Sequence, residues 1–508
     1  MMNFFLNITF PNVFTHLWGL RPFLYRVPIP SDISSKQFFN WSTIEPLSNL
    51  SWVDCYSDYQ CTRFQVPIDY SNEDGDKAAL AVIKLPAQSE TQYKGAILMN
   101  PGGPGGRGVA FLLSLGSSLA SVVGNQYDII SFDPWVGNST PRVEFFPSKE
   151  EHSQWLAVPD HWTTVFNTTS DEIPHLWASA QVIAQLAEQR DAGFMNYIST
   201  DNIARDMLRI NEAAGQVKLH QSLPSSYGTV LGSTFATMFP HKVERIVLDG
   251  VLDMDRYYRN HTTLRDGWHD DTVDADADMQ SFFDGCVAAG PDRCAFFSPT
   301  ATEVSNSLDH LYDSIIAQPV PFVTPSSYGI VDYTVLRAAV RNAMCSPYNY
   351  FSELAEGLAL LAAGDGSRIY ALQETAYGPS SVEDLFAYWE TVKGLSGFSD
   401  LLFHRRISCS GWKFHREGVF RGPITANTSY PILFIGNTAD PLTPLSLAKK
   451  TSCTFPGSIV LTQNSSGHTS LAAWSACRNA HVQAYFQNGI LPDDETVCEV
   501  ESEMFPVS

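Results

Sequence analysis

Residues 224–229 read Pro-Ser-Ser-Tyr-Gly-Thr and lie between an apolar run and a run of small residues. This pattern predicts a strand, a sharp turn and a helix, with a serine at the tip of the turn. The residue two positions after that serine must be small, because the backbones of the helix and the strand come close together there. Gly228 meets this requirement for Ser226 and not for Ser225, so Ser226 is the candidate nucleophile.

A glycine-rich loop follows a second apolar run. Gly95–Met99 predicts a strand, and residues 100–108 read Asn-Pro-Gly-Gly-Pro-Gly-Gly-Arg-Gly. So many glycines leave main-chain N–H groups uncovered, which is what an oxyanion hole requires. We expect its donors to be the N–H of Tyr227 and one from Gly102 or Gly103. A phosphate-binding loop is the rival interpretation, but the Lys-Ser/Thr pair and the spacing of a dinucleotide fingerprint are missing.

Two further apolar runs near the C-terminus lead to an acid and to a histidine. Residues 430–436 predict a buried strand followed by Asp440, and residues 458–461 predict a strand that leads to His468. Functional side chains of open α/β sheets lie at the C-terminal ends of strands. We expect His468 to act as the base for the serine and Asp440 to hold the imidazole. Asp249 also ends a strand and is the alternative acid, although a strand-end Asp-Gly is commonly only a turn.

Together, these motifs resemble the tripeptidyl-aminopeptidase-like group of α/β-hydrolases, which is related to the prolyl aminopeptidases. The resemblance extends from about Trp52 to the C-terminus, and the chain order Ser, Asp, His is the order of α/β-hydrolases. It implies a serine hydrolase that cleaves peptide bonds near a free N-terminus through an acyl-enzyme. The motifs that carry it are NPGGPGG at 100–106, SYGT at 226–229, LDG at 248–250, GNTADPLTP at 436–444 and GH at 467–468.

Two positions depart from the family's pattern. Pro224 stands where the family usually has glycine, and proline fixes φ and removes an N–H group at the end of the strand. Trp135 stands where the family's Asp-Pro-Arg-Gly-Val-Gly loop has Arg-Gly. The departures leave two alternatives to a peptidase. One is an esterase or amidase that acts on a small natural product, and the other is a catalytically impaired binding protein of the same fold.

The order of the apolar runs predicts an α/β protein with the α/β-hydrolase fold, in which a mostly parallel central sheet carries a large helical cap insertion. Strands are expected near 78–84, 95–99, 127–132 and 244–248, and a helical excursion over 172–215. Cap helices are expected over 304–317, 333–343, 351–363 and 381–393. The predicted division is a leader of uncertain order over 1–51, the first part of the core over 52–250, the cap over 251–425 and the C-terminal part of the core over 426–508.

The predicted cap begins with a group of acids. A substrate with a free amino terminus needs an acidic anchor, but acids also suit a solvated helix start near the positive end of the helix dipole. We favour the solvated helix start. The residues concerned are Asp270, Asp271, Asp274, Asp276 and Asp278.

Charge and composition limit the partners. The 508 residues are 44% hydrophobic, as in a packed globular protein, and carry a formal net charge of −22. This charge argues against nucleic acid and against anionic membrane surfaces as partners. Residues 1–20 make an apolar start without any charged side chain, but polar residues interrupt it, so an atypical signal peptide and a weak anchor both stay open, and we expect no stable membrane span. The expected partner is a peptide or a small ester or amide substrate.

Cysteines and glycosylation sequons indicate an oxidising compartment. Short spacings suit disulfides for the pairs Cys55/Cys61, Cys286/Cys294 and Cys477/Cys498, and no Cys/His pattern predicts a metal site. We therefore expect no metal ion and no cofactor. The chain has nine cysteines, so at least one of Cys345, Cys409 and Cys453 stays unpaired. Eight N-x-S/T sequons favour a glycoprotein of the secretory pathway; they begin at Asn7, Asn40, Asn49, Asn138, Asn167, Asn260, Asn427 and Asn464.

Overall fold

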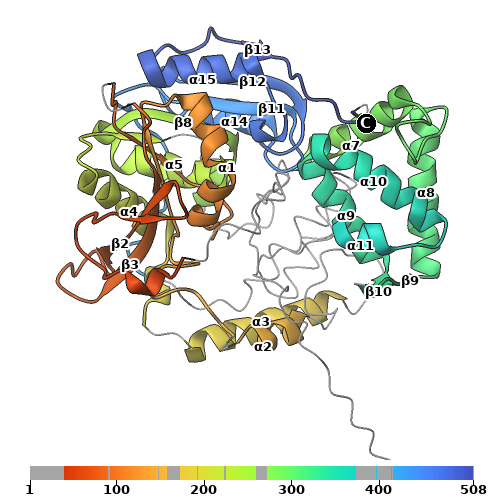
Figure 1. The fold of residues 1–508 in the computed structure, drawn as a ribbon, viewed down its shortest axis with the longest axis horizontal. Helices are drawn as coiled ribbons and strands as arrows, with labels where there is room; N and C mark the ends of the chain where they lie inside the picture. Colours follow the sequence, from red (N-terminus) through yellow and green to blue (C-terminus); the bar gives the residue numbers. More distant parts are fainter. Residues whose placement is uncertain are drawn as a thin grey trace, which may run out of the picture.

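The computed structural model describes residues 39–89, 92–146, 148–156, 172–190, 193–221, 225–258, 272–325, 327–372, 396, 414 and 416–506. Within these residues, a central sheet of eleven strands carries helices on both faces, and a second group of helices forms a lobe beside it (Figure 1). This is the α/β-hydrolase fold with a helical cap that the sequence predicts.

The central sheet is antiparallel at one edge and parallel elsewhere. Its strand order is β1-β2-β3-β5-β4-β6-β8-β11-β12-β13, with β7 paired to β8. Neighbours are antiparallel from β1 to β5 along this order, and all later pairs are parallel. The strands are β1 (Val53–Cys55), β2 (Tyr59–Pro67), β3 (Lys77–Leu85), β4 (Ala96–Met99), β5 (Asp128–Phe132), β6 (Leu219–Gln221), β7 (Ser225–Ser226), β8 (Val243–Val251), β11 (Leu433–Ala439), β12 (Ile459–Ser466) and β13 (Val497–Cys498).

Alternating side chains of the buried strands supply two separate cores, one on each face of the sheet. In β3, Leu80 and Val82 join the core under α4 (Thr200–Ala213), α5 (Tyr227–Met238) and α14 (Leu445–Ser452). Their neighbours Ala81 and Ile83 join the opposite core, under α1 (Gly108–Val123) and α15 (Ala476–Asn488). The all-apolar strands seen in the sequence are therefore apolar because both of their faces are covered.

The chain leaves the sheet after β8 and builds the cap before it returns at β11. The cap has its own core, in which Phe282, Leu336 and Phe351 are buried. After α6 (Met254–Tyr258), which packs on the core beneath α5, its described elements are α7 (Ala275–Ala289), α8 (Ala301–Ala317), β9 (Val320–Val323), β10 (Tyr328–Val331), α9 (Tyr333–Cys345), α10 (Pro347–Ala362) and α11 (Ser367–Leu372). Two more helices, α2 (Lys149–Leu156) and α3 (Glu172–Arg190), precede α4. Figure 1 shows α7 and α10 as the part of the cap nearest β11 and β12.

The expected strands and the three disulfides are confirmed. Helices α8, α9 and α10 lie where cap helices are predicted, whereas the helix expected over 381–393 lies outside the described residues. The domain limits at 251 and 425 stay predictions. The disulfides join Cys55 to Cys61, Cys286 to Cys294 and Cys477 to Cys498. Among the helices that the structure describes, none combines the length and the apolar character that a bilayer crossing needs.

Candidate active site

Ser226 lies at the junction of β7 and α5, in a backbone conformation that residues other than glycine rarely adopt. Its φ is 57° and its ψ is −122°. Such a conformation costs on the order of 1–3 kcal/mol for a residue with a side chain, so the surrounding contacts must hold it. Its carbonyl accepts a hydrogen bond from the Thr229 hydroxyl at 2.6 Å, inside the first turn of α5. Ser226 is half-buried, whereas Ser225 is 1% exposed.

The glycine-rich loop lies directly on this turn. A Cβ atom on Gly102 would be 2.1 Å from the carbonyl oxygen of Ser225 and 3.2 Å from the nitrogen of Gly228. Gly102 also has a φ of 81°, so both space and backbone conformation demand glycine here. The loop and the start of α5 are therefore in van der Waals contact, as an oxyanion hole built from both requires.

The two glycines of the expected oxyanion hole differ in their hydrogen bonding. The Gly102 N–H donates to the side-chain oxygen of Asn100 at 2.9 Å, so it is already engaged. Within the described residues, the Gly103 N–H donates to no acceptor. The Tyr227 N–H opens α5, where a helix has no acceptor of its own for its first N–H groups. Of the three N–H groups expected at the oxyanion hole, the described contacts thus engage only that of Gly102.

Asp440 and His468 form a buried pair. Nδ1 of His468 lies 2.9 Å from Oδ1 of Asp440, and the two side chains are 6% and 0% exposed. The carboxylate also accepts hydrogen bonds from the Thr443 hydroxyl at 2.7 Å and from the Thr469 N–H at 2.8 Å. Burial alone would raise the pKa of Asp440, but the imidazole and the N–H groups of Thr469 and Leu442 outweigh it and hold the pKa below its ordinary value.

Asp249, the alternative acid, is engaged elsewhere. Its two oxygens accept hydrogen bonds from the N–H and the hydroxyl of Ser470, at 2.9 and 2.7 Å. Burial raises the pKa of Asp249, and the Ser470 hydrogen bonds only partly oppose this rise. The structure therefore pairs His468 with Asp440 rather than with Asp249.

Strand β8 joins the serine turn to the histidine loop. Ser226 lies opposite Val251 in the sheet register. The adjacent Gly250 packs so closely on the histidine loop that a Cβ atom there would be 2.6 Å from the Thr469 side chain. The three loops that carry the candidate residues thus meet at one edge of the sheet, at the C-terminal ends of parallel strands.

The cap contributes two acids close to this edge. Asp278 of α7 is 0% exposed, so the expectation of a solvated helix start is wrong for this residue. Burial and the charge of Asp440 raise the pKa of Asp278 well above its ordinary value. Asp274 is half-buried, and the same two causes raise its pKa to about 6. Asp276 is exposed, and the acids at 270 and 271 lie outside the described residues.

Of the two departures from the family pattern, only Trp135 can be described, because Pro224 lies outside the described residues. Trp135 is completely buried at a φ of 58° and donates its ring N–H to Asp206 at 2.9 Å. Its ring stacks on Phe194 at a centroid distance of 6.1 Å. The residue thus has a packed place in the core.

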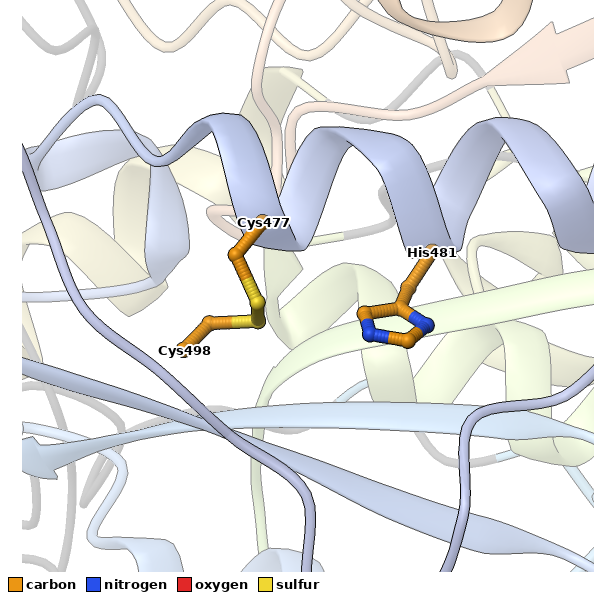
Figure 2. Close-up of side chains that lie close together, drawn as sticks. All are labelled: Cys477, His481 and Cys498. Carbon is orange, nitrogen blue, oxygen red and sulfur yellow. A yellow bond between two sulfur atoms is a disulfide. The ribbon is translucent and has the colours of Figure 1, made fainter.

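One further cluster brings together donor atoms that could suit a metal ion. Cys477, His481 and Cys498 have donor atoms within 4.8 Å of one another (Figure 2). The two sulfur atoms are joined in a disulfide, so they offer no thiolate ligands. No other such cluster occurs among the described residues.

Comparisons with known proteins find relatives that are named as a serine protease and as an aminopeptidase. Residues 395–498 match the family described as TAP-like protein. The chain is 25% identical over 477 residues to the serine protease Hip1 of Mycobacterium tuberculosis, covering 86% of this chain and 87% of the relative. It is also 25% identical over 503 residues to the tripeptidyl aminopeptidase of Streptomyces lividans, covering 89% and 87%. The resemblance predicted from the motifs is confirmed.

A third relative is named as an esterase. The carboxylesterase B of Mycobacterium tuberculosis is 26% identical to this chain over 480 residues, covering 86% of both proteins. Peptidases and an esterase are thus found at the same level of identity. These relatives support a serine hydrolase of the α/β-hydrolase fold.

Several residues of the site have no role in the sequence-based prediction. Thr443 and Asn437 lie within the GNTADPLTP motif, but their contacts depend on the fold. The Thr443 hydroxyl reaches the carboxylate of Asp440, and the Asn437 side chain reaches the histidine loop. The carbonyl of Cys345 in the cap accepts the His468 N–H at 3.1 Å. Only the small polar character of Thr443, three residues after the acid, is a signal that the sequence could offer.

Proposed function

We propose that this protein is a serine hydrolase that cleaves peptide bonds near a free N-terminus, with Ser226, Asp440 and His468 as its catalytic residues. The observation that carries the proposal is the conformation of Ser226. A strained serine at a strand-to-helix turn, next to a glycine loop and a buried Asp–His pair, supports a nucleophile. The named peptidase relatives support the substrate class.

The first half of the proposed reaction forms the acyl-enzyme. Oγ of Ser226 attacks the carbonyl carbon while Nε2 of His468 takes the hydroxyl proton. The negative charge on the carbonyl oxygen is stabilised by the N–H groups of Tyr227 and Gly103. When the C–N bond breaks, His468 gives the proton to the leaving amine. Asp440 keeps Nδ1 protonated and stabilises the imidazolium.

The second half releases the acyl group. A water molecule attacks the ester carbon while His468 takes one of its protons, and this proton returns to Ser226 when the C–O bond breaks. The product is a short peptide with a new carboxyl group. Asp274 and Asp278, on the cap helix α7, are candidate anchors for the substrate's ammonium group, because a bound cation would stabilise their charged forms.

An esterase or amidase that acts on a small natural product is the second candidate. The carboxylesterase relative and the replacement of the family's Arg-Gly by Trp135 favour it. The same acyl-enzyme chemistry applies, with an alcohol as the leaving group of an ester and an amine as the leaving group of an amide. A catalytically impaired binding protein is the third candidate, and it differs in having no reactive serine.

Labelling with a fluorophosphonate and a panel of substrates tests these candidates. We expect labelling of the wild type and of Ser225→Ala, and none of Ser226→Ala, because only Ser226 has the nucleophile's conformation. Fluorogenic tripeptides with a free N-terminus should be cleaved faster than acetylated tripeptides or simple esters.

Each candidate has a distinct outcome in this experiment. Labelling that survives in Ser226→Ala and disappears in folded Ser225→Ala would refute the assignment of the nucleophile. Faster turnover of esters than of free tripeptides would favour the esterase, and a wild type that is neither labelled nor active would leave the binding protein.

We also propose that the protein passes through the secretory pathway. Three disulfides support an oxidising compartment. Asn49 and Asn427 are exposed, as glycan acceptors must be, whereas the Asn138 amide donates to the buried Asp133. A mass shift on enzymatic deglycosylation, mapped to Asn49 or Asn427, is expected. Unmodified asparagines together with nine reduced cysteines would contradict the proposed route.

A further inference from the structure

The loop that carries His468 has a strained backbone. Gly467 before the histidine has a φ of 99°, and Thr469 after it has a φ of 65°. Threonine is β-branched, so a positive φ at Thr469 is unfavourable unless the surroundings impose it. The hydrogen bonds of this loop therefore determine where the imidazole lies.

Asn437 holds both sides of the histidine at once. Its side chain, on β11, is completely buried. Nδ2 donates to the carbonyl oxygen of Gly467 at 2.8 Å and to that of Thr469 at 2.6 Å. These are the peptide carbonyls of the residues on either side of His468. Since both partners are acceptors, the NH₂ group and not the amide oxygen must face them.

A comparison with Gln463 separates this role from that of an ordinary buried amide. Gln463 lies opposite Asn437 in the register of β12 with β11 and is also completely buried. Its Nε2 donates to the hydroxyl of Ser465 and to the carbonyl of Ser470, at 3.0 and 3.1 Å. Both amides leave their own oxygen without a donor in the described part of the chain. Of these two amides, only that of Asn437 donates to the residues that flank His468.

We infer that Asn437 is a positioning residue, which fixes the backbone of His468 so that its ring stays aligned between Asp440 and Ser226. Asp440 fixes the ring through Nδ1, and the cap carbonyl of Cys345 accepts the His468 N–H. Asn437 adds the restraint on the two flanking peptide groups. The inference rests on the proposed role of His468 as the catalytic base.

The test replaces Asn437 by leucine, which has a similar size and no donor. We expect kcat to fall about 10²-fold with KM unchanged, because a small displacement of a catalytic group slows chemistry without changing substrate contacts. The rate of fluorophosphonate labelling should fall in parallel. Gln463→Leu removes an equally buried amide and should reduce kcat much less. Thr438→Val, on the next residue of β11, should leave kcat and KM unchanged.

The outcomes are distinct. A folded Asn437→Leu protein with wild-type kcat would overturn the inference, and so would an equal loss of kcat in Gln463→Leu. Circular dichroism at the assay temperature reports folding. If the leucine variant does not fold, Asn437→Ser keeps a neutral polar side chain with a single donor, which cannot bond both carbonyls, and a loss of kcat is again expected. Absence of labelling in the wild type would refute the proposed function, whereas a labelled wild type with an unaffected Asn437→Leu would refute only this inference.

Discussion

Asp206 is a buried carboxyl group that accepts hydrogen bonds from two neutral donors. The Tyr70 hydroxyl reaches one oxygen at 2.6 Å, and the Trp135 ring N–H reaches the other at 2.9 Å. Trp135 stands where the family's loop has Arg-Gly, so a neutral indole contacts this acid. Burial raises the pKa of Asp206 from 3.8 to about 7, although the two hydrogen bonds oppose the rise.

This raised pKa predicts how stability depends on pH. The folded protein binds the Asp206 proton more tightly than the unfolded chain does, so the contribution of this group is largest below its ordinary pKa. The contribution is lost as the pH rises through about 7. Asp206→Asn resembles the protonated acid, so its melting temperature should be close to that of the wild type near pH 4, and the difference should grow as the pH rises from there to about 7. At pH 8 we expect it to melt about 2–5 °C higher, as measured by differential scanning calorimetry.

A control variant distinguishes the effect of the burial of Asp206 from the effect of removing one negative charge. Asp284→Asn removes an exposed acid on α7 and should change the melting temperature equally at both pH values. A pH-independent difference between Asp206→Asn and the wild type would show that Asp206 stays charged in the folded protein.

At the scale of elements, the glycine-rich loop shows how one atom decides whether two elements can meet. Gly102 and Gly105 both have a positive φ, of 81° and 84°. A Cβ atom on Gly102 would clash with the Ser225 carbonyl, whereas one on Gly105 would meet only Val136, at 3.9 Å. Alanine at either position would thus have an unfavourable positive φ, but only at Gly102 would its Cβ atom also clash with a neighbouring residue.

Alanine substitutions separate these two effects. Gly105→Ala should destabilise the protein by about 1–2 kcal/mol and keep its activity, because only the backbone conformation is unfavourable. Gly102→Ala should also push the loop away from α5 and lower the labelling rate about 10²–10³-fold, as the loss of an oxyanion donor does. Equal labelling rates for the two folded variants would show that the loop does not contribute to the site.

The sequence predicts well the elements whose residues are buried on both sides. The runs of β3, β4 and β11 are apolar because helices cover both faces, and the ends of β4 and β11 locate the glycine loop and Asp440. The sequence does not predict strands β1 and β2, because polar residues interrupt them and their pairing is antiparallel at the sheet edge. The role of Asn437 could not be predicted either, since it depends on a contact between loops far apart in sequence.

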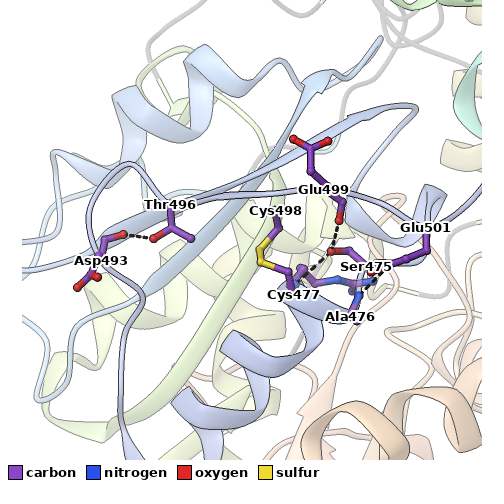
Figure 3. Close-up of a disulfide and its surroundings, with 9 residues drawn as sticks. Ser475, Ala476, Cys477, Asp493, Thr496, Cys498, Glu499 and Glu501 are labelled. Atoms are coloured by element: carbon purple, nitrogen blue, oxygen red, sulfur yellow. Dashed lines mark hydrogen bonds between the residues drawn. A yellow bond between two sulfur atoms is a disulfide. The ribbon is translucent and has the colours of Figure 1, made fainter.

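At the scale of the whole molecule, residues 499–506 connect the core to the cap. Near the disulfide, the segment is bound to the start of α15, where the Ser475 hydroxyl donates to the Glu499 carbonyl at 2.6 Å (Figure 3). Farther on, Phe505 is 4% exposed and packs on Phe282 of the cap at a centroid distance of 6.0 Å. The Arg293 side chain donates to the Phe505 carbonyl at 3.0 Å. The segment thus links the disulfide to α7, the helix that carries Asp278.

We therefore expect the disulfide between Cys477 and Cys498 to stabilise the attachment of the cap as well as the core. The double variant Cys477→Ser/Cys498→Ser should lose about 2–5 kcal/mol of stability. Amide hydrogen exchange should become faster in residues 499–506, because this segment is no longer fixed at its start. It should also become faster in α7, which packs on the segment. Cys55→Ser/Cys61→Ser removes a disulfide from the β1–β2 hairpin, far from the segment, and should leave exchange in α7 unchanged. If both double variants speed up exchange in α7 equally, the disulfide acts only through global stability. If neither does, residues 499–506 do not restrain the cap.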